Sequence, residues 1–107
     1  LEAKKIADLA ETYYIPVATH NVAGPIATIA SANFAASVRE FMGHEVFIMN
    51  PKNQEGNGVN GDPDVLGYDK EMVKDGYLQL TDRPGLGIEL NEDLVESYLV
   101  EGEDWWD

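Results

Sequence analysis

Two residues near the start of the chain combine acid–base chemistry with positions that can hold a side chain still. His20 ends the apolar run 15–20, and Glu45 lies within a second apolar run, 41–49. An imidazole titrates near neutrality and therefore suits proton transfer. A carboxylate among apolar neighbours is costly unless it is paired, hydrogen-bonded or directed into a polar cavity. We therefore take His20 as a candidate general base or acid, and Glu45 as a candidate member of the same polar site.

The residue types alone leave a structural alternative open for each candidate. A histidine at the end of a strand is equally consistent with a hydrogen-bonded residue at the rim of the fold. A carboxylate within a strand is also consistent with an inward residue that bridges strands. His44 precedes Glu45 and alternates to the opposite face of the strand, so we interpret it as a packing or supporting residue.

Other kinds of site find little support in the sequence. The chain has no cysteine, which excludes a disulfide and a thiolate metal site in this segment. Gly85-Leu86-Gly87 lacks the preceding strand and the following helix of a dinucleotide-binding motif, so it indicates backbone geometry instead. We therefore assign no cofactor or metal ligand within these 107 residues.

The first 50 residues alternate between helical and strand patterns. Apolar residues recur at three- and four-residue spacing over 1–14, and Pro25 suits the first turn of a second helix that runs to about Arg39. The runs 15–20 and 41–49 are nearly continuous apolar stretches, as in strands buried on both faces. The order helix, strand, helix, strand predicts parallel pairing with right-handed crossovers, and therefore α/β architecture.

The second half of the chain has a different character. Residues 51–69 are rich in Gly, Asn and Asp and show no periodicity, which predicts an irregular loop. After this loop, Asp75-Gly76 lies between two short β-prone runs and predicts a tight hairpin. Residues 85–90 are expected to add a further short strand.

The C-terminus combines a helix with an acidic, aromatic tail. Asn91 is predicted to cap a helix from residue 92 to about residue 100. Trp105 and Trp106 are adjacent, and an exposed pair of this kind would be adhesive. We therefore expect at least one of the two tryptophans to dock on the body of the fold.

Two parallel strands cannot form a stable sheet alone, because their edges leave backbone groups unpaired and both faces need covering. A (β/α)₈ barrel takes about 250 residues and gathers its active site at the carboxyl ends of its strands, where His20 and Glu45 fall. We therefore expect the C-terminal portion of an α/β barrel whose natural start lies upstream. Residues 1–50 would belong to the barrel, 51–69 to the loop, and 70–107 to the hairpin, helix and acidic tail.

The charge balance bears on the class of partner. Twenty acidic and seven basic residues give a formal net charge of −13, which repels phosphate backbones and anionic lipid surfaces. No run reaches the roughly 18 apolar residues of a membrane-spanning helix, and the first residues carry helical periodicity, not a targeting pattern. We therefore expect no nucleic-acid or membrane partner, and a cytoplasmic location for the parent protein.

The acidic residues are dispersed over the helices and the tail, and lysine is scarce. Such a surface is typical of halophilic proteins, in which dense carboxylates stay hydrated while cations screen their repulsion. The alternative is the acidic end of an ordinary protein. If the surface is a salt adaptation, dialysis into low salt is expected to unfold the protein, as circular dichroism would show. Secondary structure that is indifferent to salt would refute the adaptation.

The sequence also carries a family resemblance, which extends over nearly the whole chain. The segments 3–11, 15–21, 24–27 and 82–90 together resemble the C-terminal part of the enolase superfamily. Within that superfamily the chain is most similar to the mandelate racemase subgroup, and there to sugar-acid dehydratases of the galactonate and gluconate type. The combination of His20, the following Gly24-Pro25-Ile26-Ala27 and the stretch Pro84-Gly85-Leu86-Gly87-Ile88-Glu89 carries most of its specificity.

The resemblance implies a fold and roles for both candidate residues. The chain would supply the last two strands and helices of the barrel, with a C-terminal hairpin and helix packing on a capping domain. His20 matches the general base or acid that follows the seventh strand, which an aspartate on the sixth strand orients. Glu45 matches the glutamate that hydrogen-bonds the substrate carboxylate as it becomes an enediolate, and it could donate that bond if its buried setting protonates it. The ligands of the family's Mg²⁺ are expected upstream of this segment.

The implied activity is that of a Mg²⁺-dependent sugar-acid dehydratase, which gives a 2-keto-3-deoxy acid. The same enolate-forming first step serves a racemase or cycloisomerase, and this alternative stays open. An alternative of another class is a noncatalytic acidic interaction module. The expected partners are a small-molecule sugar acid, the remainder of the same polypeptide and further copies of it in a homo-oligomer, and the segment alone is expected to be inactive.

Overall fold

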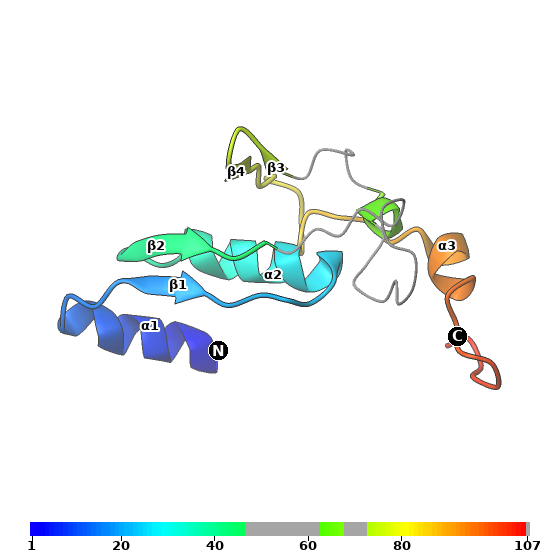
Figure 1. The fold of residues 1–107 in the computed structure, drawn as a ribbon, viewed down its shortest axis with the longest axis horizontal. Coiled ribbons are helices and arrows are strands. Elements are labelled where there is room, and N and C mark those ends of the chain that lie inside the picture. Colours follow the sequence, from blue (N-terminus) through cyan, green and yellow to red (C-terminus); the bar gives the residue numbers. More distant parts are fainter. Residues whose placement is uncertain (47–62, 68–72, 107) are drawn as a thin grey trace.

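The computed structural model describes residues 1–46, 63–67 and 73–106. Figure 1 shows the order of the elements, which are α1 (Glu2–Thr12), β1 (Val17–Thr19), α2 (Pro25–Ala36), β2 (Phe41–His44), the 3₁₀ helix η2 (Pro63–Leu66), β3 (Val73–Lys74), β4 (Tyr77–Leu78) and α3 (Glu92–Glu96). Among the described residues, no helix is long and apolar enough to cross a membrane.

Strands β1 and β2 lie side by side and are parallel, with α2 as the connection between them (Figure 1). Thr19 pairs with His44 at the carboxyl ends of the two strands. Helix α2 begins at Pro25, whose fixed φ suits the first turn of a helix, and Gly24 caps it. The predicted helix–strand–helix–strand order with parallel pairing is therefore confirmed.

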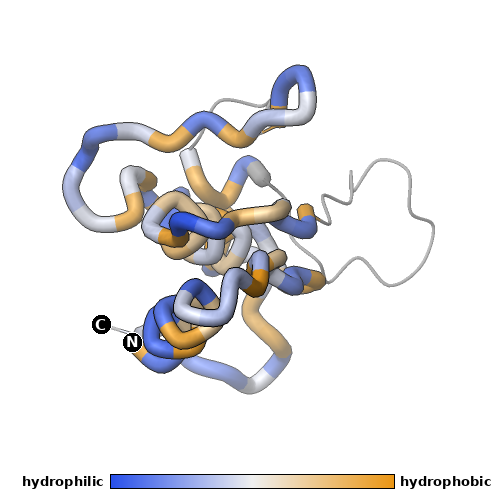
Figure 2. The backbone as a smooth tube through the Cα atoms, turned by 90° about the vertical axis from the view of Figure 1, so that its left-hand side faces the viewer, coloured by the Kyte–Doolittle hydropathy of each residue, from blue (hydrophilic) through white to orange (hydrophobic). Residues whose placement is uncertain are grey.

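The apolar face of α1 is largely uncovered by the described residues. Ala7 is buried, but Ile6, Leu9 and Tyr13 are 67%, 62% and 69% exposed. Figure 2 shows hydrophobic and hydrophilic residues together along this helix, next to the N-terminus. The amphipathic helix is confirmed, and its apolar side chains need neighbours that the described residues do not supply.

The strands are shorter and less buried than the apolar runs predict. Strand β2 ends at His44, so Glu45 follows the strand instead of lying within it, and residues 47–49 are outside the described residues. In β1, Thr19 is buried but Ala18 is exposed. The prediction of strands buried on both faces is therefore wrong for this structure, because one partner strand and the helices cover only part of β1.

The main hydrophobic cluster joins α2 to the C-terminal half. Ile29 of α2 packs with Val65 and Leu66 of η2, and further apolar side chains cover them, namely Leu78, Ile88, Leu94 and Val95. The prediction that residues 51–69 form an irregular loop is thus wrong for 63–66, which form a short helix at the centre of this cluster. The rest of that segment lies outside the described residues, apart from Gly67.

The C-terminal turns follow local signals in the sequence. Asp75 and Gly76 have φ angles of 50° and 80°, which suit a tight turn between antiparallel β3 and β4, so the predicted hairpin is confirmed. The predicted strand over 85–90 is wrong. Gly85 and Gly87 there have φ angles of 66° and 76°, a left-handed conformation that interrupts an extended run.

The last helix and the tail are only partly as predicted. Asn91 caps α3 and accepts a hydrogen bond from the backbone N–H of Leu94, although α3 ends at Glu96, earlier than expected. Trp105 and Trp106 stack on each other, with ring centroids 4.1 Å apart. Trp106 remains 58% exposed.

Candidate active site

The two predicted site residues meet at the carboxyl edge of the parallel pair. His20 directly follows β1 and Glu45 directly follows β2. The His20 Nδ1 and Glu45 Oε2 atoms are 2.6 Å apart. Because parallel strands end at the same edge, residues 25 positions apart in the sequence become neighbours in space.

Glu45 accepts a second hydrogen bond, from the backbone N–H of Asn21 to Oε2, at 2.9 Å. This bond is the main cause that holds the pKa of the Glu45 carboxyl group below its ordinary value. Partial burial opposes it, whereas the hydrogen bond and charge of His20 and the charge of His44 lower the pKa further. The Glu45 side chain is 50% exposed. The burial that would protonate Glu45 is not present around this half-exposed side chain, and the lowered pKa favours an ionised acceptor.

The contact with Glu45 assigns the proton on the His20 ring. A carboxylate only accepts hydrogen bonds, so Nδ1 of a neutral His20 carries the hydrogen and donates it to Oε2. The Nε2 atom is then left with a free lone pair, which is the form that a general base requires. The His20 side chain is 77% exposed, so this nitrogen can be approached.

The lowered pKa of Glu45 gives the stability of this site a pH dependence. Folding favours the ionised carboxylate, whose ordinary pKa is 4.5. Its contribution to stability is therefore complete above about pH 4.5 and is lost as the pH falls through the folded pKa. We predict that the urea midpoint of the parent exceeds that of Glu45→Gln near neutral pH, and that the difference shrinks in acid. A difference that stays constant from about pH 6 to about pH 3 would contradict this prediction.

The turn after His20 is held by a buried polar network. The Asn21 side chain donates from Nδ2 to Thr28 Oγ1 at 2.8 Å and accepts from the backbone N–H of Ala23 at 3.3 Å. Thr28 Oγ1 in turn donates to the carbonyl oxygen of Gly24 at 3.2 Å. Sequence reasoning treated this segment only as a turn and missed Asn21 and Thr28. The available signal was an Asn at a turn start, where its side chain commonly bonds the backbone two residues on.

A second cross-strand pair lies directly behind His20 and Glu45. Thr19 Oγ1 and His44 Nδ1 are 2.5 Å apart and belong to register partners on β1 and β2. The Nε2 atom of His44 is buried and has no hydrogen-bond partner among the described residues. This placement supports the interpretation of His44 as a supporting residue, since its ring holds the ends of the two strands together.

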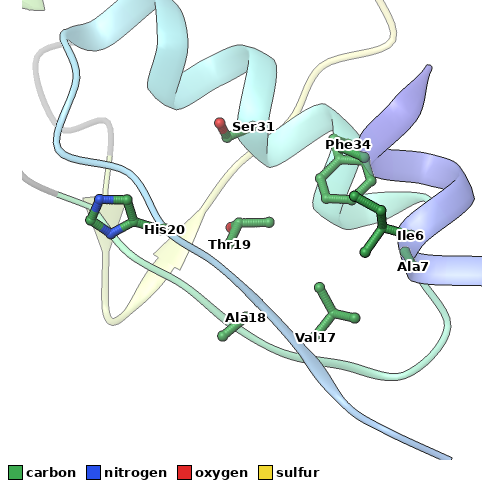
Figure 3. A pocket seen from close by; sticks show the side chains of 9 residues that line it. Ile6, Ala7, Val17, Ala18, Thr19, His20, Ser31 and Phe34 are labelled. Carbon is green, nitrogen blue, oxygen red and sulfur yellow. The ribbon is translucent and has the colours of Figure 1, made fainter. Parts of the chain in front are cut away.

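A groove of about 270 Å³ begins beside His20 and runs between α1, β1 and α2. Figure 3 shows His20 at one end and the apolar side chains of Ile6, Ala7 and Phe34 at the other. Most of its lining is apolar, with Thr19 and Ser31 adding hydroxyl groups. The apolar end of the groove therefore offers little to a charged group, and His20 is its one titratable lining residue among the described residues.

The described part of the chain contains few groups of metal-ligating side chains. Within 1–46, 63–67 and 73–106, no three His, Asp or Glu side chains gather so that they could hold a metal ion. His20 and Glu45 thus do not form a metal centre by themselves within these residues. The expectation that Mg²⁺ ligands lie upstream stays a prediction.

Sequence comparisons relate the chain to sugar-acid dehydratases. It is 39% identical to a D-xylonate dehydratase of Haloferax volcanii over 99% of this chain and 24% of that protein. It is 30% identical to a D-gluconate/D-galactonate dehydratase of Picrophilus torridus over 95% of this chain and 24% of that protein. A D-galactonate dehydratase of Xanthomonas campestris is 32% identical over 97% of this chain and 26% of its own length. The chain therefore spans about a quarter of these relatives.

A solved structure and a family match agree with these relatives. The crystal structure of a mandelate racemase/muconate lactonizing enzyme-like protein from Rubrobacter xylanophilus superposes with a TM-score of 0.74 at 36% identity. That match covers 94% of this chain and 24% of the solved chain. The family described as enolase C-terminal domain-like matches residues 1–94. The chain, with its parallel strands and the His20–Glu45 pair at their ends, therefore belongs to the enolase C-terminal domain-like family.

Proposed function

We propose that this chain is part of a sugar-acid dehydratase, which removes the proton next to a carboxylate and then eliminates water. The relatives named as dehydratases support this assignment, because they match nearly the whole chain. The observation that carries the mechanism is the 2.6 Å contact between His20 Nδ1 and Glu45 Oε2 at the strand ends. Such an edge is where barrel enzymes place their catalytic groups.

In the first step, His20 Nε2 takes the proton from the carbon next to the substrate carboxylate. The electrons of the broken C–H bond move into the carboxylate and form an enediolate. This step puts a second negative charge on an anionic substrate, so the base must be aligned with the C–H bond before the reaction. The exposed His20 ring, anchored through Nδ1, meets that requirement.

Glu45 would act on His20 in two ways. It fixes the tautomer, because the hydrogen stays on Nδ1 and leaves Nε2 free. Its negative charge also stabilises the imidazolium that forms when Nε2 gains the proton. The family resemblance implies different roles, in which Glu45 donates a hydrogen bond to the substrate carboxylate and an aspartate on the sixth strand orients His20. The ionised, half-exposed Glu45 of this structure favours the contact with His20.

In the second step, the enediolate expels the hydroxyl group of the next carbon. This oxygen leaves as water, so an acid must supply a proton to it. The product is an enol that becomes a 2-keto-3-deoxy acid on ketonisation. We assign the leaving-group acid to a part of the protein outside this chain, and we propose that residues 1–50 are the barrel portion and 70–107 the segment that packs on a capping domain.

A racemase or cycloisomerase is the second candidate function. The solved relative is named for mandelate racemase and the muconate lactonizing enzyme, and such enzymes share the first step. A racemase would return the proton to the same carbon and release no water. Formation of a 2-keto acid therefore separates the two candidates.

The decisive experiment measures the mass and the activity of the natural protein that carries this chain. The purified protein would be incubated with a panel of sugar acids, with and without Mg²⁺, and 2-keto-3-deoxy acids would be detected. Metal-dependent product from at least one acid is the expected result. Exchange of the α-proton with D₂O without a keto product would favour the racemase. A protein of 11.8 kDa without turnover or exchange would leave the acidic interaction module as the better description.

A further inference from the structure

We infer that Asn21 and Thr28 are positioning residues that hold His20 and Glu45 in register for proton abstraction. This inference rests on the proposed function. The buried hydrogen bond between the Asn21 amide and the Thr28 hydroxyl connects the turn to α2, and it would help to set the reaction geometry. Neither residue touches the reacting atoms in this proposal, so both act through His20 and Glu45.

Both residues are enclosed although both are polar. Asn21 is 4% exposed and Thr28 is 1% exposed, and each is hydrogen-bonded through its side chain. A buried amide or hydroxyl group without a partner costs free energy, so this pair strongly favours one conformation of the turn. Thr28 lies in the first turn of α2, beside Ile29 of the main hydrophobic cluster. The network therefore ties the turn to a packed helix.

The backbone of Asn21 links the Asn21–Thr28 hydrogen bond to the site. Its side chain bonds Thr28 and the backbone N–H of Ala23, which fixes the peptide unit at the start of the turn. The N–H of that unit donates to Glu45 Oε2 at 2.9 Å. The adjoining residue is His20, which contacts the same oxygen at 2.6 Å. One carboxylate oxygen thus receives two donors that the turn holds in place.

Because Asn21 and His20 share the Glu45 Oε2 acceptor, a movement of one donor disturbs the other. If the Asn21 N–H rotates away from Oε2, Glu45 loses the bond that contributes most to its ionised state. The Glu45 carboxylate then also becomes free to move, and His20 loses a fixed partner for Nδ1. A displacement of about 1 Å at a reacting group can cost roughly 100-fold in rate. Loss of the Asn21–Thr28 hydrogen bond is therefore expected to lower kcat more than it weakens substrate binding.

The test replaces Thr28 with valine in the natural protein, because valine keeps the shape and removes the hydroxyl acceptor. Thr28→Ser restores the hydroxyl and serves as the conservative rescue. We expect Thr28→Val to lower kcat, measured per folded protein, by about 10- to 100-fold with KM little changed. Thr28→Ser should recover most of the loss. A general loss of folding would reduce the amount of folded enzyme and would leave this kcat unchanged.

A matched control comes from the same helix. Asn33 has the same side chain as Asn21, but its partner among the described residues is the carbonyl oxygen of Ile29 within α2. Asn33→Ala removes a partly buried side-chain hydrogen bond of α2 but does not change the turn. The kcat of this variant should therefore stay near the parent value. A kcat loss in Asn33→Ala equal to that of Thr28→Val would overturn the inference, because any weakening of α2 would then suffice.

Amide hydrogen exchange supplies a readout that does not depend on turnover. The Asn21 N–H should exchange roughly three- to tenfold faster in Thr28→Val than in the parent, the change expected for loss of one hydrogen bond. Unchanged kcat, or unchanged exchange at Asn21, would overturn the inference. If the parent converts no sugar acid, the proposed function fails, and the exchange rate of Asn21 alone then decides whether Thr28 holds the turn against Glu45.

Discussion

Replacing His20 with asparagine is expected to lower kcat of the natural protein by about 10²- to 10⁴-fold, the range that a positioned general base supplies. Asparagine keeps a polar side chain of similar length but cannot take a proton near neutral pH. The Glu45 carboxylate and the Asn21 N–H would remain in place. The measurement is the rate of 2-keto acid formation, together with the rate at which the α-proton exchanges with D₂O.

The exposure of His20 means that its replacement should change activity without a large change in stability. Within this chain the His20 side chain is 77% exposed and contacts Glu45, so its loss should change the free energy of unfolding of this part of the protein by no more than about 0.5 kcal/mol. Loss of α-proton exchange with unchanged stability would identify His20 as the base. A variant that keeps more than about a tenth of the parent kcat would rule out that role, because a general base contributes more than this.

The pairing of His20 with Glu45 shows which part of a site can be predicted from sequence. His20 ends one apolar run and Glu45 lies within a second one. Parallel strands place their carboxyl ends at one edge, so the proximity of the two residues could be predicted. The protonation of Glu45 could not. It depends on the direction of the Asn21 N–H, which the turn geometry sets and which no periodicity reports.

The fold divides in a similar way between local and tertiary signals. Asn91, Pro25 and Asp75-Gly76 act through bonds and dihedral angles within a few residues, and the structure confirms what they predict. The 3₁₀ helix over 63–66 is different. It is one turn long, lies among turn-forming residues and has no period to detect, so only its packing against α2 reveals it.

The burial of the apolar face of α1 also could not be predicted from the sequence. The spacing of Ile6, Leu9 and Tyr13 predicts a helix with a buried face, and the helix forms. The face stays exposed, because burial depends on which neighbours are present and the described residues cover only Ala7. Amphipathic spacing therefore predicts which residues need apolar neighbours, and for this face the described residues do not supply them.

Replacing Leu66 with alanine is expected to lower the free energy of unfolding by about 2–5 kcal/mol, the range measured for buried leucines. Leu66 is fully buried at 0% exposure, between Ile29 of α2 and the C-terminal segment. Alanine would leave a cavity at the point where the two halves of the chain meet. The measurement is urea unfolding of the parent and the variant, with the fluorescence of Trp105 and Trp106 as one probe.

Leu86→Ala is the matched control, because Leu86 has the same side chain but is 40% exposed. It should cost about 1 kcal/mol or less, since much of its surface already faces water. Equal losses for the two variants would contradict a core centred on Leu66. Leu66→Ala should also loosen the candidate site. Leu66 packs against Ile29, which follows Thr28 in α2. A helix that loses its packing at Ile29 holds the Asn21 turn less firmly through the Asn21–Thr28 hydrogen bond.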